Sequence, residues 1–169
     1  MPAIALIISL VSSSYFTFSN IGAAYAGSMA LTERGRTTLS VVDRLTLWDG
    51  YYNIAKFHMG GSTVVAGASL CWAASLTPAG TLRNILVAGG IAGFAVAIYT
   101  VLRIRPVNSN LMATLRDSRA KPMDAEQEEH VLNQLDKWRA MHRVRIVLGI
   151  VSWLAATTGI LANGPFISF

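Results

Sequence analysis

Long stretches without a charged side chain dominate this sequence. Four windows contain no Asp, Glu, Lys or Arg: residues 1–32, 57–82, 84–102 and 146–169. An α-helix needs about 20 mainly apolar residues to cross a bilayer, and each window can supply roughly that length. We therefore predict an all-α membrane protein whose core is a four-transmembrane-helix bundle. The spans are expected at about 3–25, 60–78, 84–103 and 144–163.

The composition supports a membrane protein over a soluble domain. Only 14% of the 169 residues are charged and 53% are hydrophobic, whereas a soluble domain usually carries about a quarter charged residues. A chain of this length suits one integral membrane domain over residues 1–169, with membrane lipid as its surroundings. The net charge of +5 does not indicate nucleic-acid binding, because the basic residues fall in blocks between the spans.

The basic residues also predict an orientation. Of the 14 Lys and Arg residues, 13 lie in the two long segments that follow the first and third spans or at their edges, and only Arg83 lies in the short connection between spans two and three. By the positive-inside rule, the two long segments are cytosolic and both termini lie on the opposite side. We expect a multi-pass protein of an endoplasmic-reticulum-type membrane.

The first window has an alternative interpretation. The sequence Ala24-Tyr25-Ala26 before Gly27 resembles a signal-peptidase site, and cleavage there would leave three spans. The segment lacks a basic amino-terminal region, and its apolar stretch is longer than a typical signal core. Both features favour a retained transmembrane helix.

The two long segments are predicted to be amphipathic helical extensions on the cytosolic side. Residues 38–58 carry a broad apolar and aromatic face that leads into the second span, with Trp48, Tyr51 and Tyr52 expected at headgroup depth. Gly60-Gly61 is expected to mark a bend between this lead-in and the span. Residues 122–143 place acids early and bases late, which suits the helix dipole.

Two further local features bear on the elements. Pro106 disfavours helix at Arg105 and is expected to end the third helix there. Cys71 is the only cysteine and lies in an apolar run, so an internal disulfide is excluded and a buried, inert thiol is expected.

The residues with chemical potential gather where charge stops before the fourth span. Trp138, His142 and Arg145 are spaced i, i+4, i+7, so on a helix they share one stripe. An aromatic ring, a titratable imidazole and a fixed cation are therefore aligned at the mouth of a predicted span.

No soluble-enzyme motif accompanies this stripe. The sequence contains no GxGxxG turn, P-loop, GxSxG or HExxH. The three histidines have no metal-ligand spacing among themselves, since His130 lies in an acidic stretch and His58 at a membrane interface. We therefore predict no metal site.

An ordered set of marks resembles a known family. The marks are Asn20-Ile21-Gly22-Ala23-Ala24 ending the first helix, Trp48 and Tyr52 before the second, Arg105-Pro106-Val107-Asn108-Ser109-Asn110-Leu111 after the third, and Trp138-x-x-x-His142-x-x-Arg145 entering the fourth. Together they resemble the anthrone oxygenase (anthrone oxidase) family, small four-span membrane proteins of fungal aromatic polyketide pathways with bacterial relatives. The third mark is similar to the Pro-x-Asn-x-x-Leu turn of that family.

The resemblance implies a monooxygenase of secondary metabolite biosynthesis, which oxidises an anthrone to an anthraquinone with molecular oxygen and without flavin, haem or metal. The chemistry is consistent with this. The methylene of an anthrone is acidic because its carbanion is a delocalised enolate, and that enolate is electron-rich enough to pass an electron to oxygen. Such a site needs a base, donors for the enolate oxygen and a dry, flat cavity.

The resemblance also assigns roles to residues of this chain. His142 is expected to be the catalytic base, and Arg145 the cation for an enolate or phenolate oxygen. Two groups complete the site: the amides of Asn108 and Asn110, which would hold oxygens, and the rings of Trp48, Tyr52 and Trp138, which would stack on a planar substrate.

Other interpretations stay open. The protein could perform another tailoring reaction on a hydrophobic metabolite, or it could be a non-catalytic scaffold that tethers biosynthetic enzymes through its cationic face. The arginines could be lipid anchors, the aromatic residues an interfacial belt and the asparagines turn caps. The small residues of spans two and three could serve a homo-oligomer instead of the bundle. An enzyme requires a cavity that joins His142 to the 106–110 turn.

Overall fold

The computed structural model describes residues 2–163, and all of its regular structure is helical. The elements are α1 (Pro2–Tyr25), η1 (Ala30–Thr32, a 3₁₀ turn), α2 (Val41–Ser75), α3 (Thr81–Tyr99), η2 (Thr100–Ile104, a π-helical turn), α4 (Arg105–Ser118) and α5 (Ala125–Asn163). Because α3, η2 and α4 follow one another without a break, these residues form four long helical paths.

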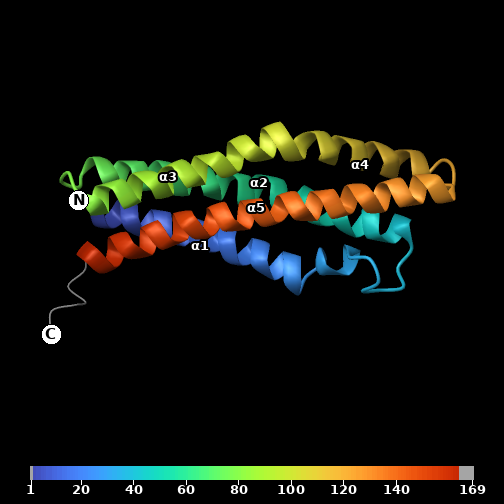
Figure 1. The fold of residues 1–169 in the computed structure, drawn as a ribbon, viewed down its shortest axis with the longest axis horizontal. Helices are drawn as coiled ribbons and strands as arrows, with labels where there is room; N and C mark the ends of the chain where they lie inside the picture. Colours follow the sequence, from blue (N-terminus) through green and yellow to red (C-terminus); the bar gives the residue numbers. More distant parts are fainter. Residues whose placement is uncertain (1, 164–169) are drawn as a thin grey trace.

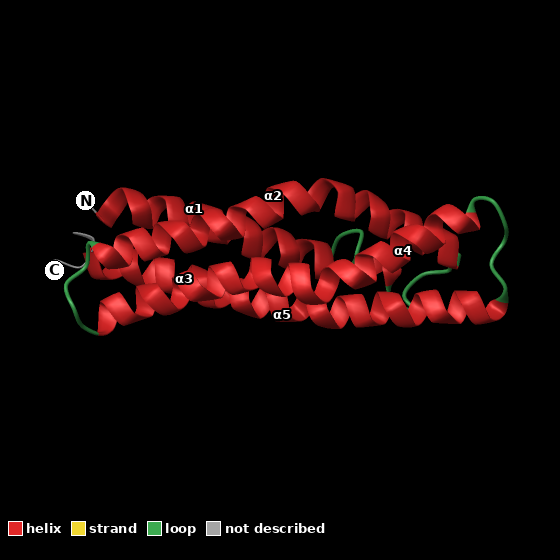
Figure 2. Cartoon of the chain, turned by 90° about the horizontal axis from the view of Figure 1, so that it is seen from above, coloured by secondary structure: helices red, strands yellow, loops and turns green. Residues whose placement is uncertain are grey.

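The helices are arranged as a long bundle with two parts (Figures 1 and 2). At one end α1, α2, α3 and α5 pack against one another. At the other end α2, α4 and α5 continue as an extension, against which η1 and the loop before α2 lie. The start of α1, the end of α5 and the short α2–α3 turn share the first end (Figure 1).

Three helical stretches are long and apolar enough to cross a membrane: Ala3–Thr32, Thr81–Ser118 and Ala125–Ala162. They contain the first and third predicted spans and all but the last residue of the fourth. Helix α2 packs alongside α1 and α3 over the same part of the bundle, but it is not among these stretches. The second span at 60–78 therefore stays a prediction, and α2 itself ends at Ser75.

The expected bend at Gly60-Gly61 is wrong. Helix α2 runs for 35 residues through both glycines, so the predicted amphipathic lead-in and the following apolar segment form one helix. Ser40 starts it, because its hydroxyl accepts a hydrogen bond from the Asp43 N–H at 3.1 Å. Packing against α1 and α3 holds the glycines in the helix despite their low helical propensity.

The expected end of the third helix before Pro106 is also wrong. Arg105 has helical angles, φ −54° and ψ −42°, and the path continues into α4 with Pro106 in its first turn. Pro106 has no N–H to bond the preceding turn of this continuous path, so the winding must change near it. The π-helical turn η2 supplies the change in winding just upstream.

Two smaller expectations need correction. Cys71 is exposed at the edge of the α2–α3 contact, where its Sγ lies beside Gly90. Helix α2 turns the neighbouring Leu70 and Ala74 inward instead. The helix predicted from Pro122 begins at Ala125 and continues to Asn163 as part of α5. A reciprocal cap sets this start, since the Gln127 N–H donates to Asp124 Oδ1 at 2.9 Å and the Asp124 N–H to Gln127 Oε1 at 3.2 Å.

Glycines allow close contacts between the helices. A Cβ on Gly67 of α2 would lie 3.0 Å from the Gly90 carbonyl oxygen of α3, and one on Gly93 would lie 3.0 Å from the Gly67 backbone. On the other side of α3, a Cβ on Gly89 would lie 2.2 Å from the Ala155 Cβ of α5. Small residues thus bring α3 into backbone contact with both neighbours.

The extension has a hydrophobic core of its own. The buried residues of this core come from the η1 region, α2, η2, α4 and α5: Met29, Val41, Leu45, Trp48, Ile104, Val107, Leu111, Leu115, Val131, Leu135 and Trp138. Arg34 ties the loop before α2 to α5 through Glu129, Asn133 and Asp136. Trp48 is fully buried in this core, so it does not lie in an interfacial aromatic belt as one interpretation of the sequence had it.

Candidate active site

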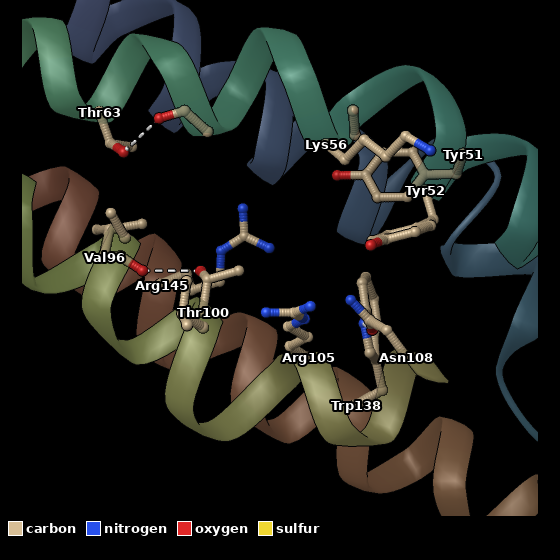
Figure 3. Close-up of a pocket in the computed structure, with 14 residues that line it drawn as sticks. Tyr51, Tyr52, Lys56, Thr63, Val96, Thr100, Arg105, Asn108, Trp138 and Arg145 are labelled. Atoms are coloured by element: carbon tan, nitrogen blue, oxygen red, sulfur yellow. Dashed lines mark hydrogen bonds between the residues drawn. The ribbon is translucent and has the colours of Figure 1, made fainter. Parts of the chain in front are cut away.

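A cavity of about 270 Å³ lies where the four-helix part meets the extension. It opens between α2 on one side and α3, η2 and α4 on the other, with α5 behind (Figure 3). Its lining consists of Tyr51, Tyr52, Ala55, Lys56, Gly60, Thr63, Val96, Ala97, Thr100, Val101, Arg105, Asn108, Trp138 and Arg145. The lining contains three basic residues and no acidic one.

Arg145 is the most unusual of these residues. Its guanidinium projects into the middle of the cavity (Figure 3), and its Nε is buried without a hydrogen-bond partner. Within residues 2–163 no carboxylate lies at salt-bridge distance from it. Its aromatic neighbour is Phe16, whose ring centroid is 5.5 Å from the guanidinium carbon. A half-buried cation whose Nε is buried and which has no counter-ion is costly, so the geometry favours an anionic ligand.

Asn108 offers a second polar group to the cavity. It is 3% exposed, and its Oδ1 accepts a hydrogen bond of 2.9 Å from the indole N–H of Trp138. Because an indole nitrogen can only donate, this contact fixes which way the amide faces. The amide NH₂ group is thereby left to donate to another acceptor, and the bond ties α4 to α5 at the cavity wall.

The walls around these polar groups are aromatic. Tyr52 and Trp138 line the cavity from α2 and α5. Behind Tyr52, the ring of Trp48 stacks in parallel at a centroid distance of 5.4 Å, and the same indole meets Trp138 edge-on at 6.3 Å. Trp48 thus supports both cavity walls without lining the cavity itself.

His142 lies one ring away from the cavity. It is 2% exposed, stacks on Trp138 at 4.7 Å, and makes no hydrogen bond of standard geometry through either ring nitrogen, although the backbone of Asn20 lies close to it. The ring contributes to a second, smaller cavity of about 70 Å³ on the far side of Trp138, beside Glu33. The imidazole therefore has no direct contact with the larger cavity.

Tyr51 connects the two environments. It lines the larger cavity, and its ring meets His142 edge-on at 6.3 Å. Its hydroxyl lies 3.5 Å from Asn20 Oδ1 and 3.4 Å from Met59 Sδ. Burial raises the pKa of the Tyr51 hydroxyl to about 12, although the positive charge of Arg145 opposes this. Tyr51 is therefore a neutral hydroxyl at physiological pH.

The residues around the cavity lie in a part of the chain that matches a known protein family. The anthrone oxygenase family profile matches residues 48–155. The chain belongs to the anthrone oxygenase family. No curated protein and no solved structure shows significant similarity to it. Every residue that lines the larger cavity of this anthrone oxygenase family member lies inside the matched range.

The cavity brings together four of the seven site residues predicted from the sequence: Tyr52, Asn108, Trp138 and Arg145. Trp48 and His142 pack directly behind the lining. Asn110 is exposed on α4 and lies outside it, because two residues along a helix turn a side chain by roughly 200° away from that of Asn108.

Other lining residues of this anthrone oxygenase family member were not expected as site residues. The sequence indicates Lys56 only as a loop cation and Tyr51 only as an interfacial aromatic residue, and Arg105 as a loop cation that begins the family mark at 105–111. The spacing offered a signal for Lys56, which lies one helical turn after Tyr52 with its Nζ 5.5 Å from the Tyr52 ring centroid. Thr63 and Thr100 carried no such signal, since each hydroxyl bonds its own helix (Figure 3).

Residues 2–163 contain no group of three or more His, Cys, Asp or Glu side chains arranged to hold a metal ion. The lining offers three cations, an amide and hydroxyl groups, and no carboxylate. They suit oxygen atoms that carry negative charge.

Proposed function

We propose that this protein is a membrane oxygenase that oxidises a planar anthrone-type aromatic to the corresponding quinone with molecular oxygen, and that the larger cavity is its active site. The single observation that carries this proposal is the unpaired Arg145 guanidinium inside an aromatic-walled cavity. Membership of the anthrone oxygenase family supports the same reaction class.

The cavity suits a flat ligand with a negative oxygen. Its volume of about 270 Å³ is close to the lower end of the ~300–1,000 Å³ range of small-molecule sites. Tyr52 and Trp138 would cover the aromatic rings. Arg145 and the amide NH₂ of Asn108 would hold the enolate oxygen, so they would stabilise the charge that forms when the methylene loses a proton.

The reaction balances with oxygen as the only co-substrate. Loss of one methylene proton gives the enolate, which transfers one electron to oxygen and leaves a carbon radical and superoxide. These two combine to form a carbon–oxygen bond, and a proton converts the peroxide anion to a hydroperoxide. Loss of the second hydrogen from that carbon, with cleavage of the O–O bond, forms the carbonyl and releases water. The substrate supplies all electrons, and we propose that no flavin, haem or metal is required.

His142 remains the proton acceptor in this proposal, but Tyr51 carries the proton to it. Tyr51 lines the cavity and its ring packs against His142. Asn20 adjoins both residues. The Tyr51 hydroxyl donates to Asn20 Oδ1 and not to the imidazole, so the relay requires it to turn toward His142. It would then accept the substrate proton while it donates its own to the imidazole, and the phenolate never needs to form.

The same proposal includes a place in the cell. Helix α2 would be the fourth span, because it packs beside α1 and α3 over the length of the bundle. The positively charged extension would then lie in the cytosol and the cavity near headgroup depth. An apolar substrate could reach that cavity from the endoplasmic-reticulum-type bilayer.

Oxygen uptake tests the proposal. Purified, metal-stripped protein in detergent is mixed with a dihydroxyanthrone, spontaneous oxidation is subtracted, and the quinone is quantified. We expect one oxygen consumed per quinone, and a loss of roughly 100-fold in rate for Arg145→Gln. Arg143→Gln, an exposed neighbour outside the cavity, is the matched control and should retain the rate. No rate above background, or activity only with added metal, would contradict the proposal.

A further inference from the structure

Two cations stand at the mouth of the cavity, apart from the deep Arg145. Lys56 comes from α2 and Arg105 from the first turn of α4, on opposite walls (Figure 3). Both side chains are exposed toward the opening. Holding a single enolate oxygen at Arg145 requires neither of them.

Among the described residues neither of these two cations has an acidic partner, whereas some cations of the extension do. Arg34, Arg36 and Arg139 each form a salt bridge. The hydrogen bond of Lys56 goes to the neutral Asn53 Oδ1 at 2.9 Å, and over residues 2–163 neither Lys56 nor Arg105 reaches a carboxylate. The cavity lining therefore presents three cations and no carboxylate to a ligand.

We propose that the substrate carries a second anionic group, a ring carboxylate, which Lys56 and Arg105 bind at the mouth while the enolate oxygen lies at Arg145. This inference rests on the proposed function and names the substrate class of that site: a planar aromatic carboxylic acid. A guanidinium matches a carboxylate with two parallel hydrogen bonds, and an ammonium adds a point charge. A substrate with two negative groups also compensates the three cations better than one with a single anion.

Binding of stable product analogues tests this without turnover. Dihydroxyanthraquinone and the same quinone with one ring carboxylate are titrated into the protein in zwitterionic detergent, and tryptophan fluorescence quenching gives the dissociation constants. The carboxylated quinone should bind more tightly. Lys56→Gln and Arg105→Gln should each weaken it by about fivefold, as expected for a partly exposed ion pair. The uncharged quinone should bind all these proteins alike.

Matched control variants each remove one positive charge of the same type at a position outside the cavity. Arg103→Gln and Lys121→Gln replace exposed cations outside the cavity lining, and they should leave the preference for the carboxylated quinone intact. A second arm repeats the titration in nanodiscs of phosphatidylcholine with and without phosphatidylglycerol. If the carboxylated quinone binds more tightly in both kinds of nanodisc, the result supports the proposal. If the anionic lipid abolishes the preference, Lys56 and Arg105 hold lipid phosphate, and the proposal is overturned.

The failures of the two proposals are distinguishable. If neither quinone binds, the proposed function of the cavity fails as well. If both quinones bind equally and Arg145→Gln weakens both, the proposed function stands and only the carboxylate subsite is overturned. Equal weakening of both quinones by Lys56→Gln and Arg105→Gln would also overturn the subsite.

Discussion

At the residue scale, the chemistry depends on which side chains of one helical stripe reach the cavity. Trp138, His142 and Arg145 share a face of α5, as their i, i+4, i+7 spacing predicted. Only Trp138 and Arg145 line the cavity, whereas His142 packs behind the indole. Periodicity indicates which face is buried, but the depth of each side chain depends on the helices packed against that face. For this reason the position of Tyr51 could not be predicted.

The proton path through Tyr51 gives a prediction at this scale. Tyr51→Phe keeps the ring contacts with Trp138 and His142 but removes the hydroxyl, so we expect kcat for anthrone oxidation to fall by roughly 100-fold, within the range of general acid–base catalysis. The kcat of His142→Ala should fall by a similar factor. The oxygen-uptake assay measures both, with Tyr15→Phe, an exposed tyrosine outside the cavity lining, as control. An unchanged kcat in Tyr51→Phe would remove it from the mechanism.

At the element scale, the uncharged windows predicted most of the helices but not how they connect. Three of the four windows overlap stretches that are long and apolar enough to span a membrane, and residues 164–169 of the last window lie outside the described part of the chain. The glycine and proline signals were weaker, since α2 passes through Gly60-Gly61 and the third helix continues past Pro106. Both residues disfavour helix only locally, and tertiary packing over a 35-residue helix outweighs such preferences.

The contact between α3 and α5 gives a prediction for stability. Gly89→Ala would place a methyl group 2.2 Å from the Ala155 Cβ, so α3 must move and the protein should lose about 1–3 kcal/mol of unfolding free energy. A lower Tm in detergent measures this. Gly61→Ala on α2 is the matched control, because its Cβ meets nothing within 4 Å and should leave Tm unchanged or slightly raised. Equal Tm values for Gly89→Ala and the wild type would refute the close contact.

At the scale of the whole molecule, the basic residues are divided as the bundle is. Only Arg83 lies beside the short α2–α3 turn, and the other 13 belong to the two long segments or their edges. One end holds the loop that Arg34 joins to α5, together with α4 and the parts of α2 and α5 that share its core. The short turn between α2 and α3 lies at the other (Figure 1). The sequence predicted extensions of this kind, but their common core depends on contacts between segments far apart in the chain, which local patterns do not reveal.

The orientation can be tested by cysteine labelling in sealed membrane vesicles. Ala79→Cys in the α2–α3 turn and Lys121→Cys in the α4–α5 turn are introduced with Cys71→Ser, which removes the exposed native thiol. In vesicles with the cytosolic side outward, a membrane-impermeant maleimide should label Lys121→Cys at once. It should label Ala79→Cys only after detergent is added. Labelling of both positions without detergent would contradict a four-span topology.

The central claim is that Arg145 stabilises a negative oxygen in the cavity, and ligand ionisation tests it most directly. A dihydroxyanthraquinone changes colour when its phenol ionises, so absorbance against pH gives the ionisation midpoint of the bound ligand. The account predicts a midpoint lower by about one pH unit or more than that of the free quinone, equivalent to about 1.4 kcal/mol or more. The shift should disappear in Arg145→Gln and persist in Arg143→Gln. An unshifted midpoint in the wild-type complex would contradict the account.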